Sequence, residues 1–88
     1  MKEKFHTRLQ RLRNQKDISV RQMAQRIDVP ESTYREWEYG RQIKGEPYGK
    51  LAVALNVSLN ELLTGKKDKL EVYLDQIELA VKGIKVLL

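Results

Sequence analysis

The sequence predicts an all-helical fold in which five short helices are followed by a longer amphipathic helix. Three observations predict it. Apolar residues recur at spacings of three and four along most of the 88 residues, which is the helical period. Ser19 and Ser58 are followed three residues later by Gln22 and Glu61, the pattern of a helix-capping box. Both prolines stand where a helix is expected to begin.

The first two predicted helices span residues 2–16 and 19–27. In the first, Phe5, Leu9 and Leu12 recur at helical spacing, and the basic residues Arg8, Arg11, Arg13 and Lys16 are expected on its other faces. Ser19 caps the second helix, whose inner face is formed by Met23, Ala24 and Ile27. Asp28 is expected to end it, because Asp tolerates the left-handed backbone conformation better than most residues.

The third predicted helix spans residues 30–39, from Pro30 to the C-terminal cap signal Gly40. Tyr34 and Trp37 share one face of this helix. They are candidates either for stacking on bases or for the core, and their helical spacing favours the core. A loop over residues 41–46 follows. Pro47 opens a fourth helix that runs to about Asn56, and Ser58 caps a short fifth helix that Gly65 ends.

Residues 69–88 predict an amphipathic helix with the apolar seam of a coiled coil, whose spacing alternates between four and three residues. The seam consists of Leu70, Leu74, Ile77, Val81, Ile84 and Leu88, and it is widened by Val72, Tyr73, Leu79, Val86 and Leu87. Packing against a partner helix is the favoured interpretation. A membrane-surface helix and a helix folded back on its own domain are the alternatives, and a membrane-surface helix is usually more basic than this one.

Composition excludes several classes of protein. The chain has no cysteine and therefore no disulfide or thiolate site. It has neither an apolar run long enough to span a membrane nor a signal-peptide core, so we expect a cytoplasmic protein. The net charge of +5 favours a polyanionic partner. Residues 1–67 carry 14 basic and 8 acidic side chains, so the basic character lies outside the last helix.

Residues 8–64 resemble the Cro/C1-type (XRE-like) helix-turn-helix family of phage repressors and bacterial regulators. The similarity rests on Leu9-x-x-Leu12-Arg13, the segment 19–27, the run from Trp37 to Arg41, and the closing segment 51–63. It implies a lambda-repressor-like DNA-binding domain of bacterial or phage origin over residues 1–65. Residues 66–88 would then form a C-terminal helix for self-association.

The resemblance also assigns roles to individual residues. The helix that begins near Pro30 would be the recognition helix, and Arg13 and Glu38 would form an ion pair that ties it to the first helix. The residues expected to touch DNA are Val20, Arg21, Glu31, Ser32, Thr33, Arg35, Glu36, Tyr39, Arg41 and Lys44. Among these, Val20 and Arg21 begin the preceding helix, and Thr33, Tyr39, Arg41 and Lys44 match phosphate-contact positions.

Two departures from the family pattern concern acidic residues. Glu31 and Glu36 stand where Gln is common, and Asp28 replaces a usual Gly. The two glutamates are either readers of cytosine amino groups or acids favoured near a helix N-terminus. Arg35 contacts a base or a phosphate, or it pairs with Glu31 four residues earlier. Arg41 and Lys44 contact phosphates or are solvated loop residues.

The favoured function is sequence-specific binding of double-stranded DNA by a homodimer or higher homo-oligomer, as a transcriptional regulator, most simply a repressor, on a near-palindromic operator. The alternative is a protein-interaction module of antitoxin or anti-repressor type on the same fold. We expect no catalysis, cofactor or metal, because His6 has no clustered partner and no catalytic constellation is present.

Overall fold

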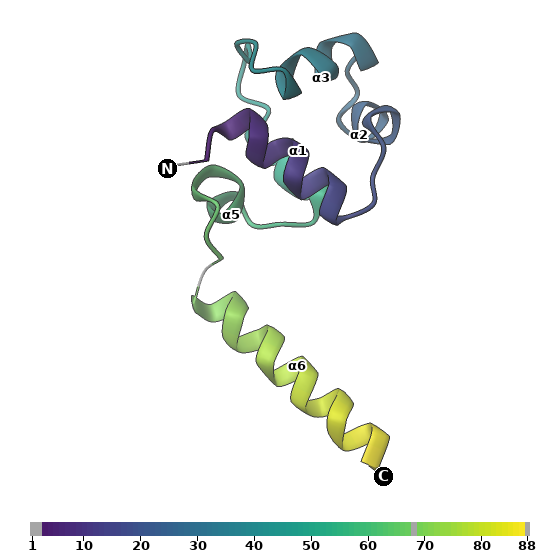
Figure 1. The fold of residues 1–88 in the computed structure, drawn as a ribbon, viewed down its shortest axis with the longest axis vertical. Coiled ribbons are helices and arrows are strands. Elements are labelled where there is room, and N and C mark those ends of the chain that lie inside the picture. Colours follow the sequence, from purple (N-terminus) through teal and green to yellow (C-terminus); the bar gives the residue numbers. More distant parts are fainter. Residues whose placement is uncertain (1–2, 68, 88) are drawn as a thin grey trace.

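The computed structural model describes residues 3–67 and 69–87, and within the last helix the side chains of residues 72–74 and 76–82. This part of the chain forms six α-helices and no strand, which confirms the all-helical prediction. The helices are α1 (Phe5–Gln15), α2 (Val20–Ile27), α3 (Glu31–Glu38), α4 (Tyr48–Leu55), α5 (Leu59–Thr64) and α6 (Lys69–Leu87). Helices α1–α5 pack into a globule, and α6 extends away from it (Figure 1).

One hydrophobic core lies inside the globule, with contributions from each of its five helices. Tyr34 and Trp37 belong to it, with 0% and 7% of their surface exposed, and their rings meet edge to face at 6.1 Å. The core interpretation of these two aromatics is therefore confirmed. The other buried members are Leu9, Leu12, Ile18, Met23, Ala24, Ile27, Leu51, Ala52, Ala54, Leu55 and Leu62.

Sequence-encoded caps set the helix boundaries. Ser19 and Gln22 form the complete capping box, and the Ser58 hydroxyl accepts from the Glu61 amide. Asp28 ends α2 in the left-handed conformation with φ 57°, as expected from the tolerance of Asp for that conformation. Asn56 ends α4 in the same way with φ 56°. These non-glycine residues cost some backbone strain at their sites, which the surrounding hydrogen bonds offset.

Three local predictions need correction. Helix α1 begins at Phe5 rather than at residue 2, because Lys4 has an extended backbone. Pro30 and Pro47 are N-cap residues rather than first helical residues. Arg8 is not on an outer face: it is 8% exposed and donates to the carbonyl oxygens of Leu62 and Leu63. The last carbonyls of a helix lack partners within the helix, and Arg8 supplies donors to those of α5.

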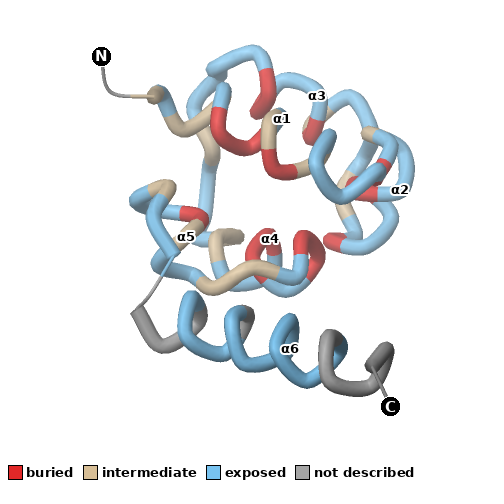
Figure 2. Tube along the Cα trace, turned by 60° about the horizontal axis from the view of Figure 1, so that its bottom comes forward, coloured by how far each residue is buried: buried red, intermediate tan, exposed pale blue. Residues whose placement is uncertain are grey.

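Helix α6 does not fold back into the core of its own chain. Its seam residues Leu74, Ile77 and Val81 are 51%, 58% and 44% exposed, and its described side chains are exposed along its length (Figure 2). At about 100° per residue, Val72 and Leu79 fall on the side opposite the seam, so they form a second stripe rather than widening the first. The side chains of Leu70, Ile84, Val86 and Leu87, and the whole of Leu88, lie outside the described part.

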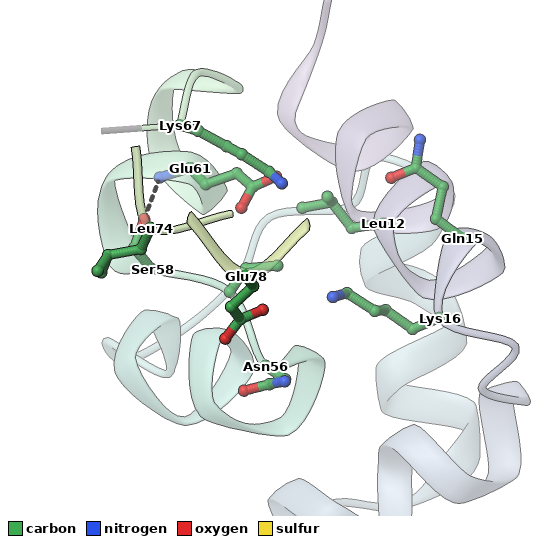
Figure 3. A pocket seen from close by; sticks show the side chains of 10 residues that line it. Leu12, Gln15, Lys16, Asn56, Ser58, Glu61, Lys67, Leu74 and Glu78 are labelled. Atoms are coloured by element: carbon green, nitrogen blue, oxygen red, sulfur yellow. Dashed lines mark hydrogen bonds between the residues drawn. The ribbon is translucent and has the colours of Figure 1, made fainter. Parts of the chain in front are cut away.

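A groove of about 660 Å³ lies between α6 and the globule. Leu12 of α1 and Lys16, which caps the end of α1, line it together with Leu74 and Glu78 of α6 (Figure 3). Lys16 therefore marks a side of the globule formed by α1 and α5, which does not include α3. No helix within the described residues is both long and apolar enough to cross a membrane.

Candidate nucleic-acid interface

Helices α2 and α3 form a helix-turn-helix unit. The turn begins at Asp28, and the Val29 amide donates to the Ala24 carbonyl at 3.1 Å, which closes the end of α2. Ala24 is only 3% exposed, and its small side chain lets α3 approach α2 closely. Two short helices joined by such a turn can present the second helix to the major groove of a duplex.

A buried ion pair fixes α3 to α1. Arg13 Nε and Nη2 donate to the two carboxylate oxygens of Glu38 at 2.7 and 2.9 Å, and Arg13 Nη1 donates to the Ile18 carbonyl at 2.9 Å. The structure thus brings together the two residues expected to pair. The hydrogen bond to Glu38 raises the pKa of the Arg13 guanidinium. Burial, followed by the nearby Glu38 carboxylate, raises the pKa of the Tyr34 hydroxyl above its ordinary value.

The outer face of α3 is open. Glu31, Ser32, Arg35 and Glu36 are all exposed, while Tyr34 and Trp37 face the core. Arg35 Nη2 donates to Glu31 Oε1 at 2.6 Å across one helical turn. This hydrogen bond is the main cause that raises the pKa of Arg35, and Tyr39 adds to it from the next turn. Half of the Arg35 side chain is still exposed, so pairing with Glu31 leaves the guanidinium accessible.

Further exposed cations lie in the segments that precede and follow α3. Arg21 is exposed in the first turn of α2, and Arg41 and Lys44 are exposed in the loop between α3 and α4. Tyr39, at the end of α3, is 72% exposed. Val20 and Thr33 are half-buried, and Val20 packs against the core, so less of these two side chains is available to a ligand. The surface therefore has a mixed-charge centre between basic margins.

Other chemistries find little support in the described residues. They contain no group of three or more His, Cys, Asp or Glu side chains that is placed to hold a metal ion. His6 packs its ring near Gly40, where an added Cβ would lie 3.2 Å from two ring atoms. The histidine is thus part of the contact between α1 and the end of α3.

Two basic residues have structural roles that the sequence reasoning did not assign. Arg8 binds the end of α5, and Arg26 donates to the Ala54 carbonyl of α4 at 2.9 Å. A signal for Arg8 was present in the spacing, because residues 5, 8, 9 and 12 fall on one helical face. Arg26 carries no comparable signal, because its partner is a backbone atom 28 residues away.

A turn-linked helix pair with an anchored, outward-facing second helix defines a helix-turn-helix DNA-binding protein. The comparison with known families agrees. The helix-turn-helix family model HTH_3 matches residues 9–62, which is more than half of the chain, and it confirms the resemblance to Cro/C1-type proteins. The chain belongs to this family of DNA-binding transcription regulators. Among curated proteins, none matches the chain.

Proposed function

We propose that the protein is a transcriptional repressor that binds double-stranded DNA sequence-specifically, as a dimer on a near-palindromic operator. The observation that carries this proposal is the contrast between the two faces of α3. Its inner face is anchored by Trp37 and by the pair of Arg13 with Glu38, whereas its outer face is open between three exposed cations. An anchored helix loses little freedom on binding, so its outer side chains are already placed to meet a ligand.

In this mechanism α3 enters the major groove, whose width of about 12 Å admits an α-helix. Arg21, Arg41 and Lys44 contact phosphates on either side of the groove. Each neutralised phosphate releases counterions, which makes the affinity depend steeply on salt. Phosphate contacts fix the register of the protein on the duplex, and the side chains of α3 read the bases.

Dimerisation through α6 supplies the second half of the proposal. The exposed seam of Leu74, Ile77 and Val81, with Tyr73 beside it, is a run of apolar surface that water solvates poorly. A second copy of α6 would cover it. The other members of the predicted seam, Leu70, Ile84 and Leu88, continue the same spacing in the sequence but their side chains lie outside the described part. Two linked domains then meet half-sites about one helical turn apart, and the linkage raises the effective affinity without new contacts. Repression follows if the bound dimer blocks access to a promoter.

Selection of bound duplexes from a random pool tests this function. The intact chain is expected to give a near-palindromic consensus. A chain ending at Lys67 keeps the buried core but lacks α6, so it is expected to fold and to lose the palindrome. If the intact chain binds no duplex at low salt, the proposed function is wrong. In that case the carboxylates of α3 and the seam of α6 would favour the protein-interaction module instead.

A further inference from the structure

The charged side chains on the outer face of α3 are held in different ways. Arg35 is bonded to Glu31, whereas the Glu36 side chain is exposed and its carboxylate makes no hydrogen bond or ion pair with a residue in the described part of the chain. Given the DNA-binding function proposed above, on which this inference rests, we propose that α3 reads adjacent G·C base pairs in the major groove. Arg35, held in place by Glu31, donates to guanine, and Glu36 accepts from the amino group of cytosine.

The bond to Glu31 prepares Arg35 to meet guanine. Only Arg35 Nη2 is committed to Glu31 Oε1, and a guanidinium carries five N–H donors in a planar fork. The remaining donors match the O6 and N7 atoms of guanine, which are two adjacent acceptors. Adenine pairs its N7 acceptor with an amino donor, which a side chain made only of donors cannot satisfy. Holding the guanidinium before binding also reduces the entropy lost on binding.

Glu36 is suited to a cytosine in the neighbouring base pair. An ionised carboxylate only accepts hydrogen bonds, and the donors of the major groove are the amino groups of cytosine and adenine. The adenine amino group lies beside N7, an acceptor that repels a carboxylate, so cytosine is the better partner. Residues 35 and 36 point about 100° apart on the helix, which directs them to neighbouring base pairs rather than to the same one.

The charge balance of this face makes the contacts discriminating. Glu31 and Glu36 outnumber the one cation, Arg35, so the outer face of α3 carries a net negative charge. Phosphates do not attract such a face. On a site without a suitable amino group, Glu36 would lose its water and gain no hydrogen bond, which costs free energy. Binding to a site of the wrong sequence is therefore weakened twice: one hydrogen bond is missing, and a desolvated carboxylate is left without a partner.

The experiment uses the intact protein on its selected site and measures the dissociation constant. Replacing the guanine that Arg35 reads by 7-deazaguanine, which lacks N7, is expected to weaken binding about 5- to 100-fold. Arg35→Ala should weaken binding to the natural site similarly and should remove the effect of 7-deazaguanine. Inosine keeps the major-groove acceptors of guanine and serves as the control, so it should leave the wild-type affinity unchanged.

Two further variants separate reading from positioning. Glu36→Ala should broaden the preference at the cytosine position and strengthen binding to random duplex, because a carboxylate is removed. Glu31→Gln should lower the preference for guanine over adenine at the Arg35 position while affinity for random duplex stays equal or rises. A merely structural role for Glu31 would instead weaken binding to both kinds of duplex alike, and that result would refute its positioning role.

The outcomes distinguish this inference from the function on which it rests. A wild-type protein that binds duplex DNA but selects A·T pairs at these positions, or that is insensitive to 7-deazaguanine, overturns the G·C assignment and leaves the DNA-binding function intact. If Arg35→Ala retains the preference for guanine, the G·C assignment is likewise overturned and the DNA-binding function is left intact. A wild-type protein that binds no duplex of any sequence at low salt overturns both.

Discussion

The globule of α1–α5 and the helix α6 follow the same apolar periodicity but end in opposite states. In the globule the periodic residues are buried, with Leu9, Leu51 and Leu62 at 0% exposure. In α6 the corresponding residues Leu74 and Ile77 are more than half exposed. Periodicity therefore specifies an apolar face, whereas burial depends on whether the same chain supplies a second face to cover it.

The first prediction concerns the buried ion pair that anchors α3 in the globule. Arg13→Ala leaves the Glu38 carboxylate, 6% exposed, without its partner. Removing one member of a buried pair costs about 3 kcal/mol or more, and urea denaturation should show this loss in the free energy of unfolding. The matched control is Arg35→Ala, which breaks an exposed pair of the same kind and should change stability little. Equal losses in the two variants would contradict the anchoring role of Arg13.

The second prediction concerns α6. Ile77→Asp places a charge in the middle of the proposed seam, so a dimer should dissociate at concentrations where the wild type remains associated, with a dissociation constant raised by at least tenfold, about 1.4 kcal/mol. Sedimentation over a concentration series measures the effect. Gln76→Asp adds the same charge to the neighbouring exposed position and should leave association unchanged. A monomeric wild type would contradict dimerisation through α6.

The third prediction concerns Gly65, where the two regions join. Gly65 ends α5 with φ +79°, and an added Cβ would lie 2.8 Å from Arg8 Nε. Gly65→Ala should cost about 1–2 kcal/mol from the left-handed backbone alone, plus the displacement of Arg8. Gly45→Ala provides the control, because Gly45 has a similar φ of +78° with no atom near its Cβ position. Chemical denaturation of both variants isolates the Arg8 contact, and identical losses would exclude it.

Local signals predicted most of the fold. The capping box at Ser19, the left-handed end at Asp28 and the inner face at Tyr34 and Trp37 are all encoded within a few residues, so helices and core could be read from spacing. The buried position of Arg8 was missed, although its spacing placed it between core residues, because a basic residue was assumed to be solvated. Its partners lie on α5, more than 50 residues away.

The candidate interface was less accessible to sequence reasoning. The exposure of Arg21, Arg41 and Lys44 follows from the fold, and their contacts with DNA stay a prediction. The sequence offered DNA and Glu31 as alternative partners of Arg35. The structure shows that the guanidinium donates a hydrogen bond to Glu31. The two faces of α6 were also merged into one stripe, because the seam pattern does not by itself separate Val72 and Leu79 from it.

If the exposed cations next to α3 contact the phosphates of duplex DNA, as we propose, binding must depend on salt concentration. The logarithm of the association constant falls linearly with the logarithm of salt concentration, with a slope of about −0.9 per phosphate neutralised. Arg41→Ala should reduce that slope by about 1, whereas Lys16→Ala, in the groove on the α1–α5 side, should leave it unchanged. An equal reduction in both variants, or no binding at low salt by the wild type, would contradict the account.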